Sequence, residues 1–150
     1  MDFIMSLRSS VEKESKQASE WCEYKDEDGN VLAKFKVRGI GFKAYQVAIE
    51  RISGYLQRNG DDISNLDADS KYNHEYIAEA MAHHLIADWS GVELSYDDGS
   101  TYELVKYTPE NAIKLLKSKG VGVLVWAFVH ENALRIQKES DAEYAEVLGK

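Results

Sequence analysis

The sequence predicts an α+β fold that is mostly α-helical, with an N-terminal β-hairpin packed on about four helices. Alternation of apolar and polar residues is clean in one stretch, residues 31–38, whereas four later stretches carry apolar residues at helical spacing. One proline and 10 glycines leave no low-complexity linker. We therefore expect a single domain, 1–150, with residues 1–19 as a mobile N-terminal segment and 140–150 as a polar, frayed C-terminal tail.

The hairpin is predicted over residues 20–38. Val31, Ala33, Phe35 and Val37 alternate with Leu32 and with basic residues, which is typical of a half-buried strand. The Asp-Gly pair at 28–29 predicts the turn, because glycine accepts positive φ without steric cost.

The four helices are predicted at 41–58, 71–88, 108–119 and 121–138. In the second, Ile77, Met81 and Leu85 form one stripe, so that this helix is expected to continue to the tryptophan at 89. Thr108 is a good N-cap for the third helix, and Gly120 is expected to follow its end. The fourth begins with VGVLVWAFV, which is apolar on all sides, and short strands at 93–96 and 101–105 flank an Asp-Asp-Gly turn.

Charge and composition exclude several classes of protein. The formal net charge is −8, so the chain lacks the basic surface that a nucleic-acid binder needs. No apolar run approaches the roughly 18 residues that span a membrane, and Met1–Leu7 is too short and too acidic for a signal peptide. We expect a soluble cytoplasmic protein, in which the single cysteine, Cys22, forms no internal disulfide.

No set of residues with a catalytic or metal-binding spacing stands out. His83 and His84 are adjacent in a predicted helix and point about 100° apart, so an ion pair or cap between His84 and Asp88 is favoured over a zinc half-site. His130-Glu131 begins like a zinc protease motif but lacks its second histidine. The acidic stretch 26–30 does not keep the spacing of a calcium loop. The sequence therefore predicts no catalytic residue, metal or cofactor.

Residues 89–112 carry a series of short motifs. Trp89 is followed by Gly-Val at 91–92, an acidic glycine turn at 97–99 and the helix start Tyr-Thr-Pro-Glu-Asn-Ala at 107–112. Before them come Trp-Cys-Glu-Tyr at 21–24, Phe-Lys-Val-Arg at 35–38 and the helix at 45–56. In this order the motifs resemble the tail assembly chaperones of long-tailed, lambda-like phages. The Gly-Lys end at 149–150 is similar to the place where such phages shift reading frame to append a second domain.

This resemblance implies a non-enzymatic protein of the bacterial host cytoplasm that is absent from the mature virion. Its implied partners are the tape-measure protein, which it coats, the tail-tube protein and a frameshifted longer form of itself, with no nucleic acid and no membrane. Coating a long protein implies a homo-oligomer, because repeated weak contacts gain strength by avidity. We expect apolar interface residues in three places. The first contains Phe3, Ile4 and Leu7 near the N-terminus, and the second contains Val121, Val125 and Trp126 in the apolar run. The third is the outer side of the hairpin.

Two other classes remain open. One is an acidic adaptor or inhibitor that mimics a polyanion, which a one-sided acidic surface would favour. The other is a small metal-dependent hydrolase that uses His83, His84 and Asp88, which a bound metal would favour.

Overall fold

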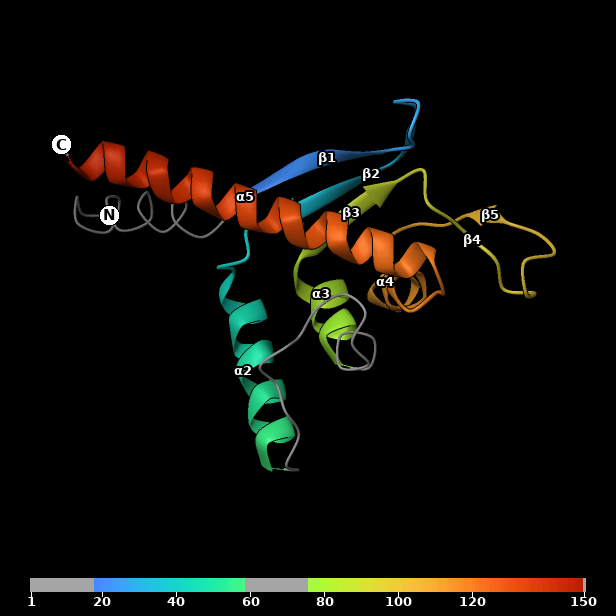
Figure 1. Ribbon diagram of the computed structural model, residues 1–150, viewed down its shortest axis with the longest axis horizontal. Coiled ribbons are helices and arrows are strands. Elements are labelled where there is room, and N and C mark those ends of the chain that lie inside the picture. Colours follow the sequence, from blue (N-terminus) through green and yellow to red (C-terminus); the bar gives the residue numbers. More distant parts are fainter. Residues whose placement is uncertain (1–17, 59–75, 150) are drawn as a thin grey trace, which may run out of the picture.

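The computed structural model describes residues 18–58 and 76–149. A three-stranded antiparallel sheet of order β1-β2-β3 lies along one side of the long helix α5, and α2, α3 and α4 lie on the other side of that helix (Figure 1). A small ribbon of β4 and β5 projects beside α4. The elements are β1 (Ser19–Lys25), β2 (Val31–Arg38), α2 (Lys43–Arg58), α3 (Ala78–His84), β3 (Ile86–Ser90), β4 (Glu93–Leu94), β5 (Glu103–Leu104), α4 (Pro109–Leu116) and α5 (Val121–Gly149). The predicted fold class is confirmed.

The hairpin of β1 and β2 forms as the sequence predicts. At its turn the Asp26 carboxylate accepts hydrogen bonds from the backbone N–H groups of Asp28 and Asn30, each at 2.9 Å, and Gly29 has a φ of +88°. Cys22 pairs with Phe35 in the register, and both side chains are buried on the face of the sheet that α5 covers. The other face carries exposed and charged side chains, as in an antiparallel sheet with one solvated side.

The prediction of a helix through residue 88 is wrong, because α3 ends at His84 and the chain becomes strand β3. The backbone N–H of Arg38 donates to the carbonyl of Leu85 at 2.8 Å, and its guanidinium donates to the carbonyl of His84 at 3.0 Å. Strand β3 then pairs with β2, with Trp89 opposite Phe35. The helical stripe ends here because β2 needs a partner for its second edge, and buried backbone groups must be paired.

The core lies between the sheet, α5 and the short helices. Phe35 is at its centre, with its ring 6.1 Å from that of Trp89 and 6.0 Å from that of Phe128 on α5. From α5, Val129 and Ala133 are completely buried. The predicted apolar face of α2 is also confirmed, since Tyr45 and Leu56 are buried and its other apolar side chains pack against the core.

The segment that joins β3 to α4 is held by two side chains of the motif series. The indole N–H of Trp89 donates to the carbonyl of Val105 at 2.9 Å, and the hydroxyl of Tyr107 donates to the carbonyl of Ala82 at 2.6 Å. Gly91 has a φ of +80° and lies close to the backbone of Leu32. The predicted N-cap is confirmed, because the hydroxyl of Thr108 accepts from the N–H of Asn111 at 3.0 Å. The predicted strands form as the two-residue pair β4 and β5.

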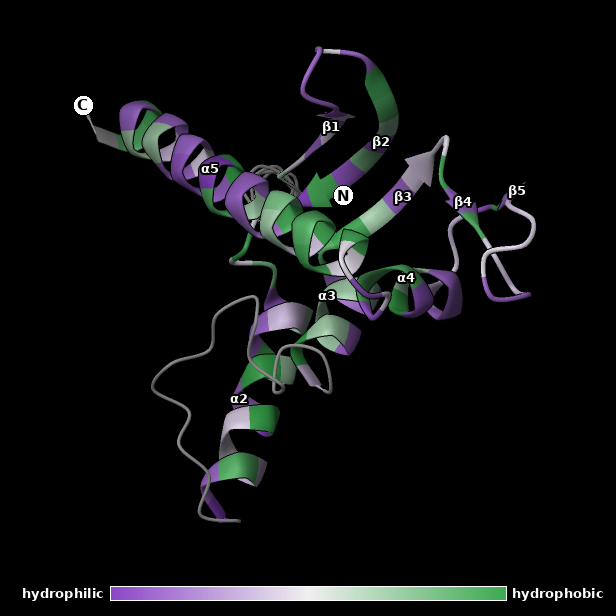
Figure 2. Cartoon of the chain, turned by 45° about the vertical axis from the view of Figure 1, so that its right-hand side comes forward, coloured by the Kyte–Doolittle hydropathy of each residue, from purple (hydrophilic) through white to green (hydrophobic). Residues whose placement is uncertain are grey.

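Helix α5 is longer than predicted. It begins at Val121, as expected, but it continues through residues 140–149, so the expectation of a frayed tail is wrong there. Figure 2 shows the difference in hydropathy: the first turns of α5 are mostly hydrophobic, and the turns near its C-terminus mix hydrophilic and hydrophobic residues. No helix in the described part of the chain is long and apolar enough to cross a bilayer.

Candidate protein interface

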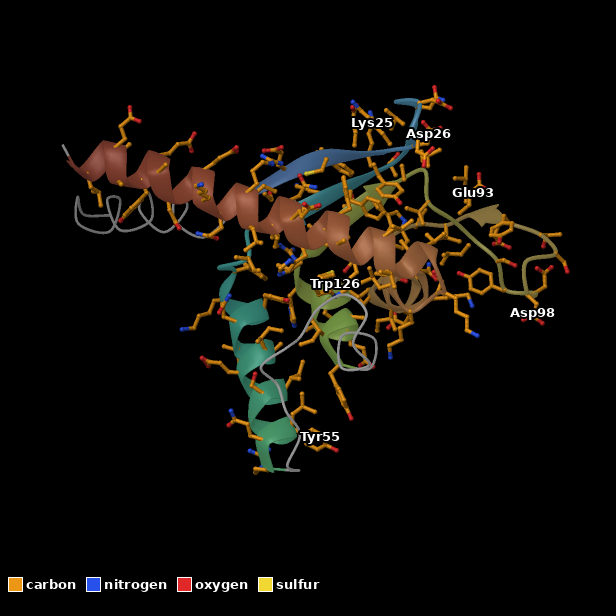
Figure 3. All side chains as sticks on the ribbon, viewed as in Figure 1. Lys25, Asp26, Tyr55, Glu93, Asp98 and Trp126 are labelled. Carbon is orange, nitrogen blue, oxygen red and sulfur yellow. The ribbon has the colours of Figure 1, made fainter. Side chains whose placement is uncertain are left out.

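The structure separates the three interface residues predicted in the apolar run. Val121 is 51% exposed, whereas Val125 is 2% and Trp126 is 8% exposed. Trp126 lies on the side of α5 that faces α2 and α3 (Figure 3). Val125 and Trp126 therefore belong to the core of the single chain and do not offer surface to a partner. Phe3, Ile4 and Leu7 lie outside the described residues.

Leu124, which is 60% exposed, is the surface residue that sequence reasoning missed. A run that is apolar on every side carries no periodicity, so its exposed positions cannot be identified from the sequence. Only the packing of α5 against the sheet decides that Val121 and Leu124 point outward while Val125 and Val129 point inward.

Beside Val121 lies a hollow of about 510 Å³, here called the α4–α5 groove. Its lining comes from β4 and the loop before β5 on one side, and from the end of α4 and the turn into α5 on the other. The lining residues are Glu93, Leu94, Ser95, Tyr102, Lys114, Leu115, Lys117, Ser118, Lys119 and Val121.

Two glycines shape the turn at this groove. Gly120 has a φ of +75°, a conformation that glycine adopts without strain, and it lets the chain leave α4 and start α5 at once. At Gly122 a side chain would collide with the backbone carbonyl of Leu116. The two helices meet this closely only because a glycine stands at position 122.

The α4–α5 groove is basic on a chain of net charge −8. It carries three lysines and one glutamate. The ammonium of Lys117 lies 2.8 Å from the carboxylate of Glu79, and that of Lys114 lies 5.1 Å from the centre of the Tyr96 ring. Together with exposed Tyr102 and Val121, these lysines suit a partner segment that is both acidic and apolar.

The outer face of the hairpin, the third predicted interface, is mixed in character. Trp21 and Leu32 are exposed there. Trp21 stands opposite Lys36 in the register, and Lys36 stands opposite Asp88 on β3. The face thus combines a few apolar side chains with rows of alternating charge.

The histidines and Asp88 do not assemble into a site. Because α3 ends at His84, Asp88 lies on β3 and is not one helical turn away, so the predicted pairing of His84 with Asp88 does not form as a helix contact. The two imidazole rings are 5.9 Å apart, and burial, followed by the positive charges of His83 and Arg38, lowers the pKa of His84. Within residues 18–58 and 76–149, no group of three histidine, cysteine or acidic side chains is placed to hold a metal.

Three further titratable side chains, those of His130, Tyr45 and Cys22, are buried or partly buried. His130 stacks on Trp126 with 4.8 Å between ring centres, and burial lowers the pKa of its imidazole. Both rings border a hollow of about 210 Å³ near Tyr45, whose pKa is raised by burial to about 12. Burial also raises the pKa of the Cys22 thiol, which makes it a poor nucleophile.

Comparison with known protein families gives a match. A family model described as YdaY prophage protein matches residues 40–150, which contain every described element from α2 to α5 and leave out the hairpin of β1 and β2. No curated protein and no solved structure matches the chain. Because this match covers well over half of the sequence, the chain belongs to the YdaY prophage protein family.

Proposed function

We propose that this prophage protein is a tail assembly chaperone, which binds and coats the tape-measure protein in the cytoplasm of the bacterial host. In this role the chain is non-enzymatic and works without a cofactor. A frameshifted longer form of the chain recruits tail-tube subunits, and neither form remains in the mature virion. The prophage family and the resemblance of residues 89–112 are consistent with this role.

The observation that carries the proposal is the apolar surface left open at both ends of α5. Val121 and Leu124 are exposed at its start, and Val147 and Leu148 at its end. Tyr102 and Leu104 add exposed apolar area beside the α4–α5 groove. A coat that repeats along a helical cargo needs such surfaces, because subunits must contact both the cargo and one another.

The motif residues that carry the resemblance hold the segment between β3 and α4 in place. Trp89 and Tyr107 anchor it by hydrogen bonds to Val105 and Ala82, and Thr108 starts the helix that forms one wall of the groove. The motif residues therefore hold the walls of the α4–α5 groove in position. The residues that would contact a partner are those that line the groove.

Co-expression with the tape-measure protein of the same prophage tests the proposal. We expect a tape-measure fragment to stay soluble with the chain and to precipitate without it. Replacing Val121 and Leu124 together by aspartate should reduce this protection, because charges would interrupt the apolar surface at the groove. The control is Leu134→Asp, at an apolar position farther along α5 that is 47% exposed, against 51% for Val121 and 60% for Leu124. A fragment that precipitates equally with and without the chain would contradict the proposal.

A further inference from the structure

The end of α5 carries an acidic and apolar surface. Residues 139–148, called the α5 tip, contain four acidic residues, Glu139, Asp141, Glu143 and Glu146, and no basic one. Glu139 accepts from Arg135 and Asp141 accepts from Gln137, so the two glutamates farther out are those placed to meet a partner. Beside them Val147 is 72% and Leu148 is 67% exposed.

The α5 tip and the α4–α5 groove complement each other. The tip combines glutamates with Val147 and Leu148, and the groove combines Lys114 and Lys119 with Tyr102 and Val121. A chain of net charge −8 offers few basic surfaces, so an acidic tip has few places to bind on a second copy. Within the described residues, the groove is a surface that offers both opposite charge and apolar contact.

The two surfaces lie at opposite ends of the molecule (Figure 1). Helix α5 has 29 residues, so its ends are about 43 Å apart at ~1.5 Å per residue. The tip of one chain therefore cannot reach its own groove, but it can reach the groove of another. A contact between two different surfaces repeats as an open chain or a ring, unless two antiparallel copies pair reciprocally with each tip in the groove of the other.

We propose that the protein associates head to tail, with the α5 tip of one copy bound in the α4–α5 groove of the next. Glu143 and Glu146 pair with Lys114 and Lys119, while Val147 and Leu148 pack on Tyr102 and Val121. In a repeating coat, this contact joins neighbouring subunits. That role in a coat rests on the proposed function.

The contact is weak for a single pair of chains. The α5 tip has ten residues, fewer than the ~20–30 that each partner contributes to a standard stable interface. Its ion pairs are exposed and are therefore screened by salt. We expect association that grows with protein concentration and declines as salt is raised.

Paired charge reversals test the proposal with the full chain alone. One variant carries Glu143→Lys with Glu146→Lys, and the other carries Lys114→Glu with Lys119→Glu. All four side chains are exposed, and the Lys117–Glu79 pair is left intact. The matched control, Glu27→Lys with Glu131→Lys, makes the same change in net charge as the tip variant at exposed positions away from both surfaces.

Sedimentation velocity across a concentration series should show assemblies larger than a monomer for the wild type and the control. Each of the two variants should associate about tenfold or more weakly, because attraction is replaced by repulsion. Mixing the two variants should restore association, since the reversed tip then meets the reversed groove and the native tip meets the native groove.

The proposal would be overturned by a wild type that stays monomeric, or by variants that associate normally and gain nothing from mixing. Deleting residues 2–17 checks whether the N-terminal segment of the same chain occupies the tip instead. Association that appears only after this deletion would also overturn it. Because no tape-measure protein is present, these outcomes are independent of the co-expression test. If the protein protects the tape measure but does not associate with itself, the proposed function stands and the contact between tip and groove is ruled out.

Discussion

Replacing Trp89 by phenylalanine tests how the sheet holds the segment that leads to α4. Trp89 is 5% exposed, its indole N–H donates to the carbonyl of Val105 at 2.9 Å, and its ring meets that of Tyr107 edge-on at 5.5 Å. Phenylalanine removes the donor, at a cost of about 0.5–1.5 kcal/mol. It also removes roughly 40 Å³ of side chain, which at ~24 cal/mol per Å³ of cavity costs about 1 kcal/mol. We expect the free energy of unfolding to fall by about 2 kcal/mol.

Urea unfolding followed by far-ultraviolet circular dichroism measures this change. The slope of the free energy of unfolding against urea concentration is expected to stay the same. The melting temperature should fall by about 4–8 °C, given about 2–4 °C per kcal/mol for a domain of this size.

Trp126→Phe is the matched control. Trp126 is also buried, but its indole N–H has no acceptor in the described part of the chain. Losing an unpaired buried donor offsets part of the cavity cost, so this variant should lose clearly less stability than Trp89→Phe. Equal losses for the two tryptophans would refute the argument that the hydrogen bond to Val105 stabilises the fold.

Three shorter predictions concern single positions. Gly91→Ala should destabilise the protein by about 1 kcal/mol, because φ is +80° at this position. Gly54→Ala in helix α2 should instead stabilise it by ~0.5–1 kcal/mol, because glycine is unfavourable inside a helix. Thermal melts of the two variants should show melting temperatures shifted in opposite directions. Cys22 should react slowly with a thiol reagent in the native protein and fast in urea, since it is buried and its pKa is raised by burial; fast labelling of the native protein would contradict this. Hydrogen bonds from Thr101 and Ser95 lower the pKa of Asp97 to about 2. The contribution of these hydrogen bonds to folding stability is therefore present above about pH 4 and is lost as pH falls toward 2. An NMR titration of Thr101→Val should show the midpoint of the Asp97 titration move up, and an unchanged midpoint would refute this cause.

Local signals in the sequence determined much of the fold. The Asp-Gly turn fixed the hairpin because glycine at position 29 adopts the positive φ that the turn requires. Thr108 and Pro109 fixed the start of α4, since capping depends on residues only a few positions apart. The start of α5 at Val121 and the Asp-Asp-Gly turn between β4 and β5 were likewise predictable.

Tertiary structure alone decided that residues 86–90 form a strand and which side chains of the apolar run 121–129 are exposed. Ile86 follows Leu85 in a pattern that suits a helix, yet Arg38 holds the last carbonyls of α3 and β2 takes the next residues as its partner strand. That pairing joins segments far apart in sequence, so no local pattern contains it. In the same way, Val125 is buried and Leu124 exposed only because the sheet lies against one side of α5. The sequence determines which segments are apolar enough to be buried, but which side chains remain open to a partner depends on how the elements pack against one another.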